Sequence, residues 1–124
     1  MKISSGFIAL MFMVSAPLLH AATPPPGAPS QATLLRNWAF SRCLAQVYAD
    51  AAVKADARAT ASAYLEYGRQ PIEAYTALQV LVDKAAARQL AGSIPGAFHT
   101  MQCIDLRDSP ELEAEVRRWV DRRP

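Results

Sequence analysis

Apolar side chains recur every three or four residues along most of the chain after residue 32, the spacing that places them on one helix face. Helices are predicted over residues 32–52, 53–68, 71–91 and 108–123. A short helix or a tight turn is predicted over residues 99–106. No segment alternates apolar and polar residues with a period of two, so no strand is predicted. The pattern therefore predicts a small all-α bundle of four to five helices.

The predicted core consists of the stripe residues of these helices. The segment 53–68 differs from the others because it is rich in alanine and serine, and its small side chains would let another helix approach closely. The residues expected to face inward are Leu34, Leu35, Trp38, Cys43, Leu44, Val47 and Tyr48, then Ile72, Tyr75, Leu78, Val82 and Ala85, then Ile104 and Leu106, and finally Leu112, Val116, Trp119 and Val120.

Glycine, proline and short polar residues mark the expected helix ends. Gly68 is predicted to end the second helix in a left-handed cap, and Pro71 to stand in the first turn of the third. Gly92 is predicted to end the third helix. The expected start of the last helix has Asp108 or Ser109 as its cap and Pro110 in its first turn.

The first 21 residues form a different kind of segment. Lys2 precedes an apolar run over residues 7–14, and small residues follow at Ala21 and Ala22, a pattern typical of a secretory signal peptide. Residues 22–31 hold four prolines and are predicted to form an extended leader before a helical domain at 32–124. We therefore expect export, to the periplasm in a Gram-negative host, and no membrane contact after cleavage.

The chain has only two cysteines, Cys43 and Cys103. An even number in an exported chain favours a disulfide, which would close a loop of about 60 residues and add roughly 4 kcal/mol of stability. Two alternatives remain at this point. Cys103 could act as a nucleophile with His99 as its base, or zinc could bind to Cys43, His99, Cys103 and Asp105. No paired CxxC or HxxxH motif supports the zinc site.

Charge and motifs narrow the function classes further. The formal net charge is +2 with Lys2 counted. Basic residues cluster only at the C-terminus, where a solvated helix end explains them, so we expect no nucleic-acid partner. The sequence contains no GxSxG, phosphate-loop or GxGxxG motif, and its carboxylates are scattered. These observations argue against an enzyme, and we predict no catalytic residue, cofactor or metal.

Four stretches of the chain resemble the type VI secretion amidase immunity proteins, in the group that protects against the fourth class of type VI amidase effectors. They are RNWAFSRCLAQVY at residues 36–48, ASAYLEYG at 61–68, PIEAY at 71–75 and FHTMQCIDLRDSPEL at 98–112. The resemblance covers nearly the whole mature chain, in order and with similar spacing. ASAYLEYG and MQCIDL are its most specific parts.

The resemblance implies a periplasmic, all-helical and usually dimeric protein that performs no chemistry. Such proteins bind a papain-like (NlpC-type) cysteine amidase that neighbouring cells inject and that cuts the peptide stem of peptidoglycan. They occlude its active-site cleft and so prevent self-intoxication. The implied partners are a cognate amidase effector and a second copy of the chain. The alternative function is that of a periplasmic zinc-binding helical protein.

Occluding a cleft requires an element that protrudes, and two segments are candidates. One is the predicted helix hairpin at residues 66–73, and the other is the turn-rich segment at 92–99. The resemblance implies contacts through the third helix and a protruding loop, as regions rather than as individual residues. The predicted partner-binding residues are Tyr67, Arg69, Gln70 and Glu73 in the hairpin and Ser93, Ile94, Gly96 and His99 in the second segment.

Overall fold

The computed structural model describes residues 26–122, so the predicted signal peptide lies outside the described part of the chain. The described residues form five helices and no strand, which confirms the all-α prediction. The helices are α1 (Gln31–Val47), α2 (Ala51–Tyr67), α3 (Ile72–Ala86), α4 (His99–Arg107) and α5 (Pro110–Val120). None of these helices is long and apolar enough to cross a membrane.

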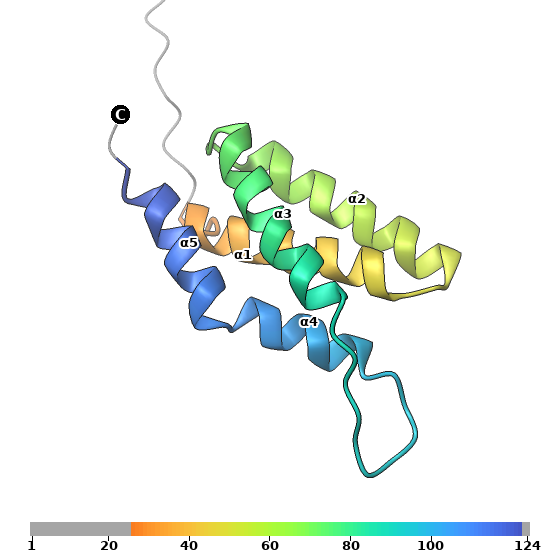
Figure 1. Ribbon diagram of the computed structural model, residues 1–124. Coiled ribbons are helices and arrows are strands. Elements are labelled where there is room, and N and C mark those ends of the chain that lie inside the picture. The colour runs from red at the N-terminus through yellow and green to blue at the C-terminus, as the bar shows by residue number, and fades with distance from the viewer. Residues whose placement is uncertain (1–25, 123–124) are drawn as a thin grey trace, which may run out of the picture.

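Helix α1 is the centre of the bundle. It contacts each of the other four helices, whereas α2 has its main contacts with α1 alone (Figure 1). Helix α3 also packs on α4 and α5. The core lies where these helices meet and is built mainly from the predicted stripes, including Leu35, Leu78, Val82 and Leu112.

Two residues that were predicted to face inward are exposed instead. Ile72 is 64% exposed because it is the first residue of α3, at the hairpin end beyond the core. Ile104 is 44% exposed because α4 turns the face carrying Cys103 and Leu106 toward the bundle. The helical period was correct in both segments, but the side of the helix that packs was wrong for these two residues.

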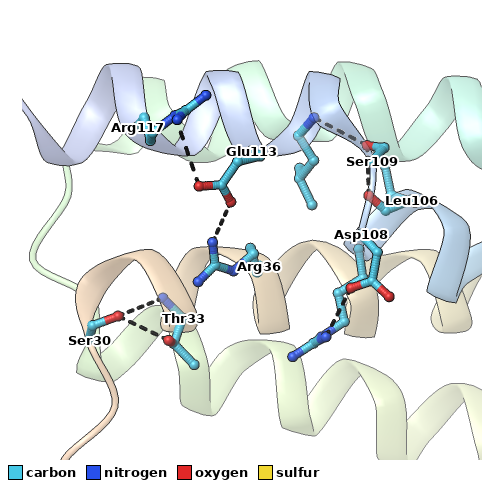
Figure 2. Close-up of polar contacts among 10 residues, drawn as sticks. Ser30, Thr33, Arg36, Leu106, Asp108, Ser109, Glu113 and Arg117 are labelled. Carbon is cyan, nitrogen blue, oxygen red and sulfur yellow. Dashed lines mark hydrogen bonds and ion pairs between the residues drawn. The ribbon is translucent and has the colours of Figure 1, made fainter.

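Side-chain caps define where three helices begin. Ser30 accepts the backbone N–H of Thr33 at 3.1 Å, and Asp50 accepts that of Val53 at 2.9 Å. The prediction of one helix over 32–52 was therefore wrong, because the chain leaves the helix at Tyr48 and restarts after the Asp50 cap. The predicted start of the last helix is confirmed, with Ser109 as its cap (Figure 2). Pro110 stands in its first turn.

Gly68 follows α2, but it does not adopt the predicted left-handed conformation. Its φ of −73° is one that any residue can adopt. The reason for glycine is packing, because a Cβ atom there would stand 1.9 Å from the hydroxyl oxygen of Tyr75. The Tyr75 ring also packs edge-on against Trp38, with ring centroids 5.2 Å apart.

An ion pair joins the first helix to the last. Arg36 in α1 contacts the carboxylate of Glu113 in α5, which also lies 3.9 Å from the guanidinium of Arg117 (Figure 2). Both partners of the first pair are partly exposed, so solvent limits its contribution to about 1 kcal/mol or less. The apolar core and the disulfide described below are the main determinants of stability.

Candidate partner-binding surface

Cys43 of α1 and Cys103 of α4 form a disulfide, with their Cα atoms 5.6 Å apart and both residues fully buried. The predicted bridge is confirmed. The two alternatives that needed a free thiol are wrong, because each sulfur is bonded to the other. In the part of the chain that the structure describes, no three His, Cys, Asp or Glu side chains gather into a possible metal site.

His99, the candidate base and candidate surface contact, is the first residue of α4 and is only half-buried. Its ring packs edge-on against Tyr48, with centroids 5.5 Å apart. The Tyr48 hydroxyl in turn hydrogen-bonds the hydroxyl of Thr100. These contacts fix His99 as part of the joint between α1 and α4 rather than as a fully exposed contact residue.

The two predicted binding segments lie at opposite ends of α3 (Figure 1). This helix has 15 residues, and at 1.5 Å per residue it separates its two ends by roughly 22 Å. The structure therefore does not bring the eight predicted residues into one patch.

The hairpin segment between α2 and α3 is short and lies close against α1. The Gln31 side-chain oxygen accepts the backbone N–H of Arg69 at 2.7 Å, and its amide donates to the Tyr67 carbonyl at 3.5 Å. Tyr67, Arg69 and Glu73 are exposed, whereas Gln70 is half-buried. This end of the molecule therefore offers exposed side chains on a short turn rather than on a long loop.

The other segment is a long connection over residues 87–98, which we call the α3–α4 loop. It extends well beyond the ends of the helices (Figure 1). Ser93, Ile94 and Gly96 are all exposed, and the Ile94 side chain is 67% exposed. The loop thus carries an apolar side chain on a projecting segment.

Helix α3 ends at Ala86, five residues before the predicted end at residue 91 and well before Gly92. The physical reason lies in α4. The fully buried side chain of Gln102 donates hydrogen bonds to the carbonyls of Ala85 and Arg88, at 2.6 and 2.8 Å. These carbonyls lie at and just beyond the end of α3, where the helix itself supplies no donors.

A groove of about 670 Å³ lies between α2 and α3. Its lining includes Trp38 from α1 and Leu65 from α2. Ile72, Thr76 and Val80 line the α3 side, and all three are exposed. Sequence reasoning missed Val80, although its signal was present. Residues 72, 76 and 80 are four apart, which places them on one exposed face of α3.

A chain of polar side chains crosses from α1 to α3 beside this groove. Arg42 donates to the Gln79 side-chain oxygen at 3.0 Å, and the Gln79 amide donates to the Asp83 carboxylate at 2.7 Å. Gln46 donates to the same carboxylate oxygen at 2.8 Å. The Gln46 and Gln79 hydrogen bonds, with the Arg42 charge, hold the pKa of Asp83 below its usual value. The network fixes α3 on α1 and leaves the Asp83 carboxylate at the surface.

The family model of the type VI secretion system amidase immunity protein, Tai4, matches residues 33–116. No curated protein matches the chain. A structure of the Tae4/Tai4 effector–immunity system from Salmonella typhimurium is 50% identical with a TM-score of 0.71. That match covers 74% of this chain and 91% of the other.

Two further solved structures are similar. One, from work on type VI-secreted toxins and self-resistance proteins of Serratia marcescens, is 33% identical with a TM-score of 0.65, covering 81% of this chain and 86% of the other. The other, a Tae4–Tai4 complex from Enterobacter cloacae, is 23% identical with a TM-score of 0.67, covering 77% of this chain and 97% of the other. At that identity the second likeness supports the fold alone.

Proposed function

The chain belongs to the type VI secretion system amidase immunity protein family, and we propose that it binds a type VI-secreted, papain-like peptidoglycan amidase and occludes its active site. The observation that carries the proposal is the family match over residues 33–116, which spans both ends of α3 and the whole α3–α4 loop. The Salmonella chain at 50% identity belongs to an effector–immunity system, which supports an amidase effector as the partner here as well.

The proposed location is the periplasm. Peptidoglycan lies there, so an inhibitor that prevents self-intoxication must meet its target in that compartment. The disulfide supports this location, because such bonds form and persist in oxidising compartments. The predicted signal peptide over residues 1–21 would provide the route.

The α3–α4 loop is the element that we propose enters the amidase cleft. A papain-like cleft holds its cysteine and histidine at the base, so an inhibitor must present a projection that reaches them. The loop projects from the bundle and carries exposed Ile94, whereas the hairpin end is a short turn that hydrogen bonds from Gln31 hold against α1. The exposed stripe of Ile72, Thr76 and Val80 would then contact the surface around the cleft.

Inhibition by this mechanism needs no chemistry from the immunity protein. Both cysteines are committed to the disulfide, and His99 packs against Tyr48 at the start of α4. We therefore propose a stoichiometric inhibitor that acts by exclusion of substrate.

A titration tests the proposed function. The purified protein is mixed with the amidase encoded in the neighbouring reading frame, and release of muropeptide fragments from peptidoglycan is measured. We expect a stable complex and complete loss of cleavage at about one inhibitor per enzyme. Full amidase activity at an excess of the protein would contradict the proposal. A non-cognate amidase of a different class serves as the specificity control.

A homodimer is proposed as the functional unit. Helix α2 packs mainly on α1 and leaves an outer face with exposed Ala52, Ala55, Ala59 and Ala63, whose small side chains allow close approach of a second copy. Sedimentation at micromolar concentration should give twice the mass of the mature chain. A single monomeric species under those conditions would contradict this part of the proposal.

A further inference from the structure

The α3–α4 loop has no regular structure of its own to hold its shape. Within the described chain, no backbone–backbone hydrogen bond joins two residues of the stretch 89–97. An exposed segment without such bonds samples many conformations unless other contacts restrict it. Whatever fixes the loop must therefore act at its base.

Gln102 contacts both ends of the loop. Its side-chain amide donates to the carbonyls of Ala85, Ala86 and Arg88, at 2.6, 3.0 and 2.8 Å, where the chain leaves α3. Its backbone N–H donates to the carbonyl of Phe98 at 3.0 Å, where the chain enters α4. One fully buried residue thus closes the base of the loop.

The orientation of this amide follows from its partners. Three carbonyl oxygens surround the nitrogen, and only an N–H group can satisfy them. The opposite orientation would place the amide oxygen against three other oxygens. The two amide hydrogens are shared among the three carbonyls, so neither hydrogen is left without an acceptor. Removal of this amide would take the side-chain donor away from all three carbonyls, and only the Ala85 carbonyl would keep another donor, the backbone N–H of Arg88.

Phe98 adds an apolar contact above this base. It is the only non-glycine residue with a positive φ (54°) in the described part of the chain. Bulky side chains rarely adopt this conformation, and surrounding contacts must hold them in it. Its ring lies directly under the loop, since a Cβ atom on Gly92 would be 2.7 Å from the ring carbon Cζ. A Cβ on Gly96 would be 3.7 Å from the same atom, an ordinary contact distance.

We propose that Gln102 and Phe98 are positioning residues for inhibition: together they hold the α3–α4 loop in one projecting conformation, and this pre-organisation sets how tightly the amidase is bound. The inference rests on the proposed function. A loop that is already ordered loses less conformational entropy when it enters a cleft, so a loosened base weakens binding without removing any contact residue.

Two pairs of variants test the inference. Gln102→Met keeps the length and burial of the side chain but removes the donors. Gly92→Ala displaces the Phe98 ring, whereas Gly96→Ala adds the same methyl group to the same loop without a clash and is the matched control. The loop-glycine pair keeps the test decisive even if Gln102→Met unfolds the protein.

Limited trypsin digestion of the full oxidised chain measures how often the loop opens, through the rate of cleavage after Arg88. Arg88 lies at the start of the loop and Arg69 in the hairpin, and both are exposed, so one digest contains its own internal control. The products are reduced and weighed by mass spectrometry, because the disulfide spans the Arg88 site. We expect cleavage after Arg88 to accelerate about tenfold in Gln102→Met and several-fold in Gly92→Ala, with cleavage after Arg69 unchanged.

Dissociation of the amidase complex is measured on the same proteins. We expect it to be about tenfold faster for Gln102→Met and Gly92→Ala than for the wild type. Gly96→Ala is the control for loop digestion only, where cleavage after Arg88 should stay at the wild-type rate. If cleavage after Arg88 stays at the wild-type rate in both variants, the loop is not held by these residues and the inference is overturned. Faster cleavage with unchanged dissociation overturns the link between loop shape and binding. If the wild-type protein binds no amidase, the proposed function itself is contradicted. The trypsin result would still decide whether Gln102 and Phe98 hold the loop.

Discussion

The two ends of α3 differ in the segment that each one carries, a short turn at its start and a long loop at its end. At the hairpin end the chain turns within a few residues and is held close against α1 by the side chain of Gln31. At the loop end the chain leaves the bundle over residues 87–98, and Gln102 holds it from below. The first end provides a surface, and the second provides a projection. In this protein the projecting segment has a buried anchor, whereas the short turn is held by a half-buried side chain.

The contacts of the two ends differ in kind as well. Gln31 is only half-buried, and one of its two hydrogen bonds is long, at 3.5 Å. Gln102 is 1% exposed, and its sequence neighbour Cys103 is bonded to Cys43 in α1. Because the amide and the disulfide are adjacent in α4, the loop end is tied to the centre of the bundle. The experiments below are arranged to separate the two ends.

Loss of the disulfide should have the largest effect on stability. The bridge joins residues 60 apart, and in the chain-entropy model its removal costs about 4 kcal/mol of unfolding free energy. Urea denaturation of Cys43→Ala/Cys103→Ala against the oxidised wild type measures this. Reductant should destabilise the wild type and leave the double variant unchanged. A loss of less than about 1 kcal/mol would show that the core alone holds α4 in place.

At the hairpin end, Gly68→Ala should destabilise the protein by about 1–3 kcal/mol, because its methyl group would collide with the hydroxyl of Tyr75. That hydroxyl is buried without a hydrogen-bond partner among the described residues, so Tyr75→Phe alone should cost little. The penalty of Gly68→Ala should shrink in the Tyr75→Phe background. An equal penalty in both backgrounds, measured by denaturation of all four proteins, would rule out this steric explanation.

The smallest effect is expected from the network between the two ends. The hydrogen bonds from Gln46 and Gln79 lower the pKa of Asp83 below its usual value of 3.8. The stability from this carboxylate is therefore complete above pH 3.8 and is lost as the pH falls through the lower folded-state pKa.

The test compares acid denaturation of the wild type with that of Asp83→Asn. The variant should show a slightly weaker loss of stability in acid, and Asp56→Asn, at an exposed position on α2, should follow the wild type. Identical acid profiles for the wild type and Asp83→Asn would mean that the network does not stabilise the contact between α1 and α3.

Much of the fold could be predicted from local pattern. The helical periods, the cap at Ser109 and the inward faces of α1, α3 and α5 follow from spacing and capping chemistry that neighbouring residues determine. The disulfide followed from the number of cysteines and the expected compartment. These features depend on the chain within a few residues of itself, or on chemistry that only two residues can perform.

The errors have different causes. The alanine-rich run after residue 85 favours a longer helix, but Gln102, far along the chain, takes up its carbonyls and ends α3 early. Gly68 looked like a cap, yet it is required by Tyr75, which belongs to the next helix. Val80 was missed because the prediction assigned only the inward face of α3, whereas Val80 lies on the exposed face of the same helix. The first two cases depend on a tertiary contact that periodicity cannot reveal, whereas the spacing that marks the exposed face of α3 was present in the sequence.

The most direct test of the account compares Ile94→Asp with Ile72→Asp in the amidase inhibition assay. The two isoleucines are matched controls, since Ile94 and Ile72 are 67% and 64% exposed and lie at the loop end and the hairpin end of α3. If the α3–α4 loop fills the cleft, Ile94→Asp should raise the inhibitor concentration for half-inhibition about 100-fold, and Ile72→Asp by less than about tenfold. Equal effects, or a larger effect of Ile72→Asp, would contradict the account.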